Sequence, residues 1–130
     1  MTTKINLSKA AQDIARNGAE KMLQVTGVTA VVVATVDGFD VASAISGNAN
    51  AARVAALASS IAAISTVVSD EAELGPSKSV IIDTESGFAI VYSVRRPDAE
   101  LVINVIANSN AILGQVAYQT AQFARTLGAA

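Results

Sequence analysis

The stretch "VTAVVVATVDGFDVASAI", residues 28–45, decides the fold predicted for this chain. Its β-branched run over residues 28–35 is apolar on both faces, which is typical of a strand inside a sheet. Asp37 and Gly38 then predict a tight turn into a second strand, so the stretch forms a hairpin. A calcium loop would need several alternating oxygen ligands and a closing glutamate, which the segment around Asp37 and Asp40 lacks.

Three more strands are predicted downstream, over "KSVIIDT" (78–84), "FAIVYSVRR" (88–96) and "ELVINVIAN" (100–108). The segments "ESG" and "PDA" between them are short enough for antiparallel hairpins. Alternation predicts one shared face in each of the last two strands. These faces comprise Phe88, Ile90, Tyr92 and Val94 in the first, and Leu101, Ile103 and Val105 in the second.

Amphipathic helices are predicted at both ends of the chain. The first is capped by Asn6 or Ser8, runs for about 16 to 18 residues and ends near Gly27. Its predicted inner stripe is Leu7, Ala11, Ile14, Gly18 and Met22. The last helix is capped by Asn108, Ser109 or Asn110 and ends at Gly128, and its predicted inner residues are Ile112, Leu113, Val116, Ala117, Thr120, Phe123 and Leu127.

A long middle helix begins after Asn48 or Asn50, covers "AARVAALASSIAAISTVV" (51–68) and ends near Leu74. It carries no charge between Arg53 and Asp70. Its predicted sheet-facing stripe is Val54, Leu57, Ile61, Ile64 and Val68, and the opposite band is small and uncharged: Ala52, Ala56, Ser59, Ser60, Ala63, Thr66 and Val67. We expect a second copy of the same helix to cover this band. The alternative is an alanine-rich helix that is simply exposed.

The elements follow the order helix, two strands, helix, three strands, helix. This order predicts an α/β (α+β) sandwich in which helices cover both faces of a five-stranded antiparallel sheet. At 130 residues, the chain is expected to form one domain over residues 1–130.

Composition excludes several function classes. The chain has neither Cys nor His, which removes thiol nucleophiles, disulfides, zinc fingers and the Ser-His-Asp arrangement, and no cofactor is expected. Nine Lys and Arg residues are scattered through a chain of net charge −2, so nucleic-acid binding is not expected.

No run of apolar residues is long enough to span a membrane, and the start "MTTKINLSKAAQD" is no signal peptide. We therefore expect a cytoplasmic protein without membrane insertion.

The hairpin at residues 28–45, the uncharged helix, "KSVIIDTESGFAIVYSV" and "ELVINVIANSNAILGQVAYQTAQFA" together resemble the Roadblock family, named for a dynein light chain. The resemblance covers nearly the whole chain and implies a profilin-like fold. It also implies a homodimer, or a heterodimer of paralogues, formed by the long helix and the strand "KSVIIDT". The expected interface comprises Ala52, Ala56, Ser60, Ala63, Val67, Val80 and Ile82.

The same resemblance implies a non-enzymatic regulator of a small Ras-like GTPase, with GTPase activation as one form of that role. The residues expected near the docking surface are Arg53, Ser59, Ser60, Thr66 and Asp70. Two alternatives stay open: a structural adaptor with no effect on nucleotide hydrolysis, and a small-molecule sensor, which would need an internal apolar cavity.

Little other chemistry is indicated. "ELGPSKS" (73–79) lacks the paired glycines of a phosphate loop and is interpreted as a turn. Arg95 and Arg96 are interpreted as residues that keep a loop soluble rather than as an arginine finger. Asp70, Glu71 and Glu73 at a helix C-terminus predict a solvated end, with a basic partner as the alternative.

Overall fold

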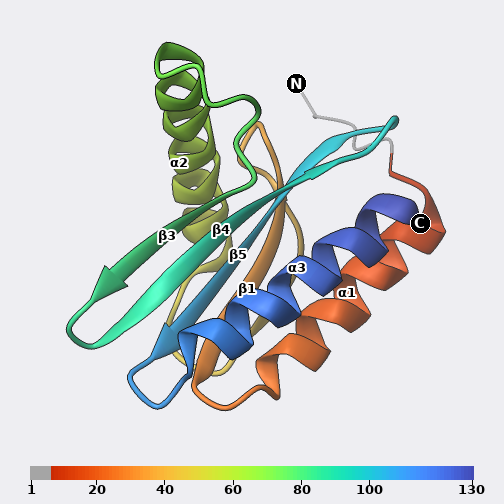
Figure 1. Ribbon diagram of the computed structural model, residues 1–130. Coiled ribbons are helices and arrows are strands. Elements are labelled where there is room, and N and C mark those ends of the chain that lie inside the picture. The colour runs from red at the N-terminus through yellow and green to blue at the C-terminus, as the bar shows by residue number, and fades with distance from the viewer. Residues whose placement is uncertain (1–6) are drawn as a thin grey trace.

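The computed structural model describes residues 7–130 and contains the predicted elements in the predicted order. They are α1 (Lys9–Leu23), β1 (Val28–Thr35), β2 (Asp40–Ile45), α2 (Ala51–Glu71), β3 (Ser79–Thr84), β4 (Gly87–Arg95), β5 (Glu100–Asn108) and α3 (Leu113–Ala129). Figure 1 shows α1 and α3 side by side on one face of the sheet and α2 on the other.

All five strands form one antiparallel sheet in the order β2-β1-β5-β4-β3. β1 lies between β2 and β5, as its two-sided apolar run predicts, and its residues from Ala30 to Ala34 are buried. β5 is the central strand. β3 is at the edge, where its hydrogen-bonding partner is β4.

The larger core lies between the sheet and the pair α1 and α3. It contains the predicted faces of β4 and β5, with Phe88, Ile90, Val94, Leu101, Ile103 and Val105 buried and Tyr92 packed at its border. Val116, Phe123 and Leu127 reach this core from α3.

The predicted inner stripe of the first helix is confirmed at Leu7, Ala11 and Met22, which are buried. Ile14 and Gly18 are only half-buried, and Ala15 and Ala19 of α1 are buried in their place. Alanine side chains allow α1 to approach the sheet closely, and this turns the bulkier Ile14 towards the edge of the contact. Ser8 caps the helix by accepting a hydrogen bond from the amide of Ala11 at 3.1 Å, and the other candidate, Asn6, lies outside the described residues.

α3 begins later than predicted. Its N-cap is Ile112, without a side-chain cap, and Ile112 is 67% exposed rather than inward. The Asn108 side chain instead accepts a hydrogen bond from the amide of Asn110 and stabilises the turn before the helix. The helix then continues through Gly128 to Ala129.

Candidate interaction surface on the long helix

α2 packs on the sheet through small side chains. Ala55 and Ala58 are fully buried and Val54 is 9% exposed, and these residues contact valines of β1, β4 and β5. Asn50 caps the helix by accepting a hydrogen bond from the amide of Arg53 at 3.0 Å. Because these side chains are short, the backbone of α2 lies close to the sheet.

The predicted sheet-facing stripe of α2 is confirmed only in part. Val54 and the half-buried Ile61 contact the sheet side, but Leu57, Ile64 and Val68 are 57%, 64% and 56% exposed. Apolar side chains occur around most of the helix, so periodicity did not reveal which of them would face the sheet. Packing selected the alanines, and the larger aliphatic side chains face outward.

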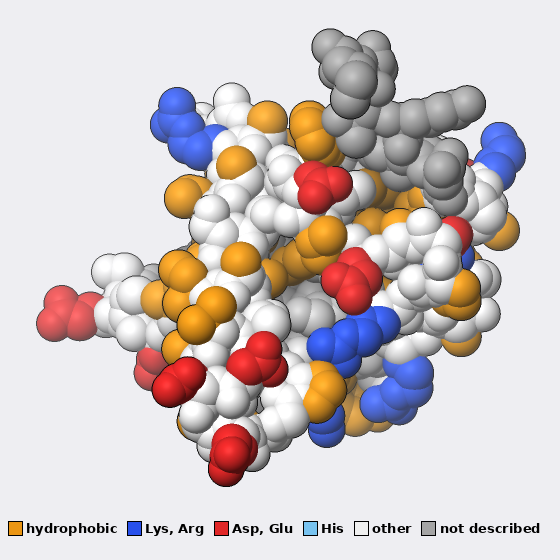
Figure 2. Space-filling view, turned by 90° about the horizontal axis from the view of Figure 1, so that it is seen from above, with side chains coloured by type: hydrophobic (Ala, Val, Ile, Leu, Met, Phe, Trp, Pro, Cys, Tyr) orange, Lys and Arg blue, Asp and Glu red, His pale blue; other side chains and the backbone are white. Residues whose placement is uncertain are grey.

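The outward surface of α2, which we call the α2 face, combines large and small uncharged side chains. It consists of Ala52, Ala56, Leu57, Ser60, Ala63, Ile64, Val67 and Val68, all exposed. Figure 2 shows exposed hydrophobic side chains beside acidic ones when the molecule is viewed from above. Large exposed apolar patches are typical of interaction sites in proteins, so the α2 face is the candidate interaction surface of this chain.

The α2 face continues towards the edge strand β3. A shallow hollow between the two elements is lined by Ile61, Ile64, Val68 and Val80, among others. Val80 is half-buried beneath α2, in the same cluster as Ala58 and Val91, and Ile82 is 40% exposed. All seven residues expected at a dimer interface thus lie on or beside this surface, and six of them are exposed.

The residues expected at a GTPase-docking surface fall in two places. Ser59 and Thr66 line a crevice of about 300 Å³ on the far flank of α2 from β3, together with Arg95 and Glu100. Asp70 lies one helical turn beyond Thr66 and is exposed. Arg53 is exposed near the N-terminus of α2, about 25 Å along the helix from Asp70. Ser60, the remaining candidate, belongs to the α2 face.

Ser59 also has a local role that the sequence did not indicate. Its hydroxyl donates a hydrogen bond to the carbonyl of Val36 in the β1–β2 turn. Gly38 of the same turn has a φ of 94° and lies against Ala56. These contacts attach the turn to α2 and position the flank that carries Ser59.

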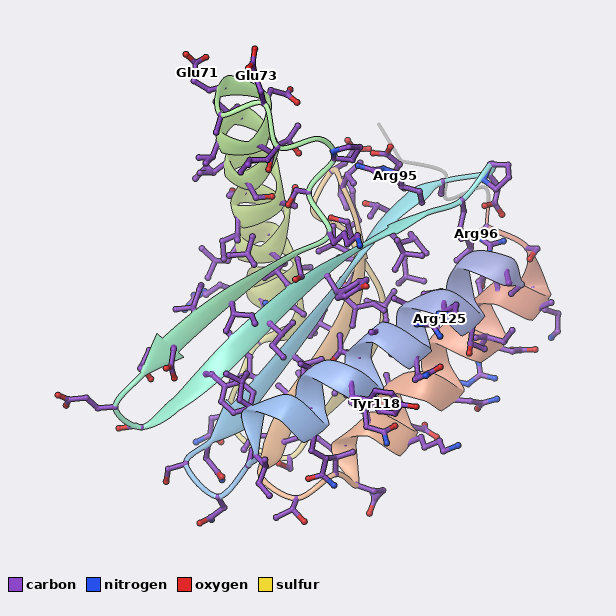
Figure 3. The ribbon with its side chains drawn as sticks, viewed as in Figure 1. Glu71, Glu73, Arg95, Arg96, Tyr118 and Arg125 are labelled. Carbon is purple, nitrogen blue, oxygen red and sulfur yellow. The ribbon has the colours of Figure 1, made fainter. Side chains whose placement is uncertain are left out.

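The acidic end of α2 stands clear of the sheet. Figure 3 places Glu71 and Glu73 at the tip of the helix. Glu73 has a φ of 56°, which ends the helix, and Gly75 follows with a φ of 81°. Among residues 7–130, no group of three or more Asp or Glu residues is arranged to hold a metal ion.

Arg96 has a structural role that sequence reasoning missed. Its side chain is only 4% exposed and forms two hydrogen bonds to Asp98, at 2.8 and 3.0 Å, and one to the carbonyl of Leu127 near the end of α3. This guanidinium lowers the pKa of Asp98 below its ordinary value of 3.8. The interpretation that Arg96 keeps a loop soluble is wrong, whereas Arg95 is exposed.

A groove lies between α1 and α3, and it is the candidate for the cavity that a small-molecule sensor would need. Its volume is about 530 Å³, and its lining includes Ile14, Lys21, Gln122 and Phe123. It is open to solvent rather than enclosed, so it does not match the internal cavity on which the sensor alternative depends.

α2 is also long and apolar enough to cross a membrane by these two criteria alone, with a mean hydropathy of 1.7 over 18 residues. Core helices of soluble proteins satisfy the same criteria, and α2 is packed on one side against a sheet. The absence of membrane insertion stays a prediction.

Comparison with known proteins identifies the fold independently. The Roadblock/LC7 domain family matches residues 17–107, which is most of the chain. No curated protein matches. The solved structures that resemble this chain include a Roadblock/LC7 domain from Streptomyces avermitilis, at 18% identity over 85% of this chain and 91% of that one, with a TM-score of 0.75.

Structures of MglB are also similar. The gliding protein MglB from Thermus thermophilus has 16% identity over 98% of this chain and 96% of its own, with a TM-score of 0.84. An MglB with a tetrameric arrangement has 17% identity over 98% and 95%, with a TM-score of 0.83. At these identities, the structural similarity establishes the shared fold.

Proposed function

This chain belongs to the Roadblock/LC7 domain family, and on that premise we propose that it is a dimeric regulator that binds a small Ras-like GTPase. The observation that carries the proposal is the α2 face, which is apolar, exposed and continuous with the β3 edge. We infer that one part of this surface mediates self-association and that a neighbouring part receives the GTPase.

The exposure of apolar side chains on the α2 face supports self-association. Leu57, Ile64 and Val67 expose more than half of their side chains, which is costly for a soluble protein. A twofold contact covers the same patch on both copies and requires no other partner. The proposed interface lies on this face and the β3 edge and includes Ala52, Ala56, Ser60, Ala63, Val67, Val80 and Ile82. A tetrameric MglB of the same fold gives a precedent for assembly of such chains.

The flank of α2 that carries Ser59 and Thr66 is the proposed docking surface for the GTPase. Because Ala63 of the proposed interface also lines this crevice, the crevice would lie at the border of the dimer and stay partly open when a second copy covers the β3 edge and the rest of the α2 face. The side chains of Arg95 and Glu100 in the same crevice, and Asp70 above it, offer charged contacts. The hydroxyl oxygens of Ser59 and Thr66 donate to the carbonyls of Val36 and Ala62 and can still accept hydrogen bonds from a partner. Arg53, at the other end of α2, would reach a GTPase only if that partner spans the helix.

We propose that the chain contributes no catalytic group to hydrolysis. It contains neither His nor Cys, and its buried cation, Arg96, is already engaged by Asp98 and Leu127. Any acceleration of hydrolysis would then come from rearranging residues of the GTPase itself. We further propose that this takes place in the cytoplasm.

Analytical ultracentrifugation tests both halves of the proposal. The protein would be sedimented alone, and then with a small Ras-like GTPase encoded beside its gene, loaded with GTP or with GDP. A dimer that binds the GTP form in preference supports a regulator and justifies a hydrolysis assay. A dimer that binds both forms equally would favour a structural adaptor without effect on hydrolysis. A monomer, or a protein that floats with lipid vesicles instead, would contradict the assignment of the α2 face.

A further inference from the structure

The groove between α1 and α3 lies on the face of the sheet opposite α2 (Figure 1) and has an apolar floor. Met22 and Phe123 form the buried part of this floor, and Ile14 and Val25 are half-buried beside them. Gly18 lies against the ring of Phe123 and adds no side chain that would fill the groove. The groove therefore keeps apolar surface open to solvent over a volume of about 530 Å³.

The rim of the groove is polar and positively charged. Four carboxamide side chains line it, and among the described residues that line it Lys21 is the only charged one, with no Asp or Glu. Arg125 projects from α3 next to the rim (Figure 3), where its guanidinium donates a hydrogen bond to the side chain of Gln122 at 3.4 Å. Such a rim complements a partner that carries negative charge.

Charge is also distributed unevenly between this helix layer and the rest of the molecule. α1 and α3 contain more basic than acidic residues: Lys9, Arg16, Lys21 and Arg125 against Asp13 and Glu20. In the rest of the described chain, four basic residues are outnumbered by nine acidic ones. Although the whole chain has a net charge of −2, the layer of α1 and α3 is thus basic and attracts an acidic partner.

The walls of the groove favour a helix over an extended segment as its occupant. Every lining residue belongs to α1, to α3 or to the two positions directly after α1, so no strand edge borders the groove. An extended peptide would find no strand to pair with, whereas a helix satisfies its own backbone groups. Ile14 and Met22 are about 12 Å apart along the axis of α1, which matches apolar anchors at positions i, i+4 and i+7 of a bound helix.

We propose that the groove between α1 and α3 is a docking site for an acidic amphipathic helix of a partner protein other than the GTPase. The apolar anchors of that helix cover Ile14 and Phe123, and its carboxylates face Lys21 and Arg125. Because α2 lies on the other face of the sheet, the groove stays accessible when the α2 face is covered. The chain can then connect the protein that binds α2 to a second protein. This proposal goes beyond the proposed function and does not depend on it.

Two synthetic peptides test the proposal. Both carry leucine at positions i, i+3, i+4 and i+7 of a helix, and the flanking positions are glutamate in one peptide and lysine in the other. We expect the glutamate peptide to bind the full chain at least about tenfold more tightly at low salt, with a smaller difference at high salt. Fluorescence polarisation measures both affinities. In NMR spectra of the labelled protein, the glutamate peptide should shift the amides of residues 14–25 and 119–126 and leave those of α2 unchanged.

Substitutions assign the binding to the rim and to the floor. K21E/R125E reverses two exposed charges, and it should weaken binding of the glutamate peptide by about tenfold or more and strengthen binding of the lysine peptide. The matched control is Lys78→Glu, exposed before β3, which should leave both affinities unchanged. Ile14→Ser removes apolar floor and should weaken both peptides, and urea denaturation shows whether this variant is folded.

Several outcomes would overturn the proposal. They are the absence of saturable binding below about 1 mM for either peptide, equal affinities for the two peptides, and amide shifts confined to α2. A wild type that ignores the glutamate peptide but floats with vesicles of phosphatidylcholine and phosphatidylserine would assign the basic layer to a membrane surface instead. A monomeric wild type that still binds the glutamate peptide in the groove would support this proposal and contradict only the proposed function.

Discussion

Gly18 on α1 lies directly against the ring of Phe123 on α3. A β-carbon at position 18 would come within 2.1 Å of Phe123 Cε1, far inside van der Waals contact. Phe123 is 7% exposed and belongs to the larger core. The missing side chain of Gly18 therefore sets how closely the two helices approach, and it shapes the groove between them.

We predict that Gly18→Ala lowers the free energy of unfolding by about 1–2 kcal/mol, although alanine is the better helix former. The helix propensity gained is about 1 kcal/mol, whereas overpacking costs about 1–3 kcal/mol because Phe123 must move. Urea denaturation measures the change. Pairing the substitution with Phe123→Leu should remove part of the clash.

Gly114→Ala is the matched control. Gly114 is also in a helix, but a β-carbon there meets nothing within 4 Å. This variant should be neutral or slightly stabilising, by up to about 1 kcal/mol. If both substitutions have the same effect, close packing is not the reason for Gly18.

We predict that Ala56→Glu together with Ala63→Glu abolishes the dimer while the chain stays folded. The two alanines are exposed in the single chain, but in the proposed interface an unpaired carboxylate costs several kcal/mol. Sedimentation should show a dissociation constant raised by at least about a hundredfold. Gln115→Glu, exposed on α3, adds the same charge outside the interface and should leave the dimer intact; a double variant that remains dimeric would refute the interface.

We predict that Asn104→Val raises the free energy of unfolding by about 1–2 kcal/mol. Asn104 is 5% exposed on β5, and within residues 7–130 its Oδ1 is buried without a hydrogen-bond donor. Its cross-strand neighbours Val32 and Val91 are both buried valines, so valine suits the position. Removing an unsatisfied buried polar group is favourable. A lower midpoint of urea denaturation would instead indicate that an ordered water satisfies Asn104.

We predict an acid-dependent contribution to stability from Asp98. Because Arg96 lowers the pKa of Asp98 in the folded protein, the unfolded state binds its proton more readily. This contribution is present above the ordinary pKa of 3.8 and is lost as the pH falls through the lowered value.

Thermal unfolding across that range provides the measurement. Asp98→Asn should be less stable than the wild type near neutral pH, and the difference should shrink below pH 3.8. The control is Asp13→Asn, whose partner Arg16 lies 2.8 Å away on the exposed side of α1. Because that ion pair is solvated, we expect little change in stability from the control. A constant difference for Asp98→Asn at every pH would contradict the linkage.

Most of the fold could be predicted from local sequence. The β-branched run at 28–35, the turn at Asp37 and Gly38 and the alternation in 88–94 and 101–105 each identify a strand without reference to distant residues. The cap of α1 at Ser8 and the cap of α2 at Asn50 are equally local. The cap of α3 was mispredicted because three polar residues before it compete, and Asn108 hydrogen-bonds within the turn instead.

The sequence by itself determined the order of the elements and the presence of a long helix without a charged outer face, because period and turn chemistry are properties of neighbouring residues. Only the tertiary structure decided which side of α2 lies on the sheet. On a helix that is apolar nearly all round, this depends on how closely the backbone can approach, and Ala55 and Ala58 allow the closest approach. The same packing leaves Leu57, Ile64 and Val68 outside and buries Arg96 against Asp98 and Leu127. Such contacts join residues far apart in the chain, and no local pattern records them.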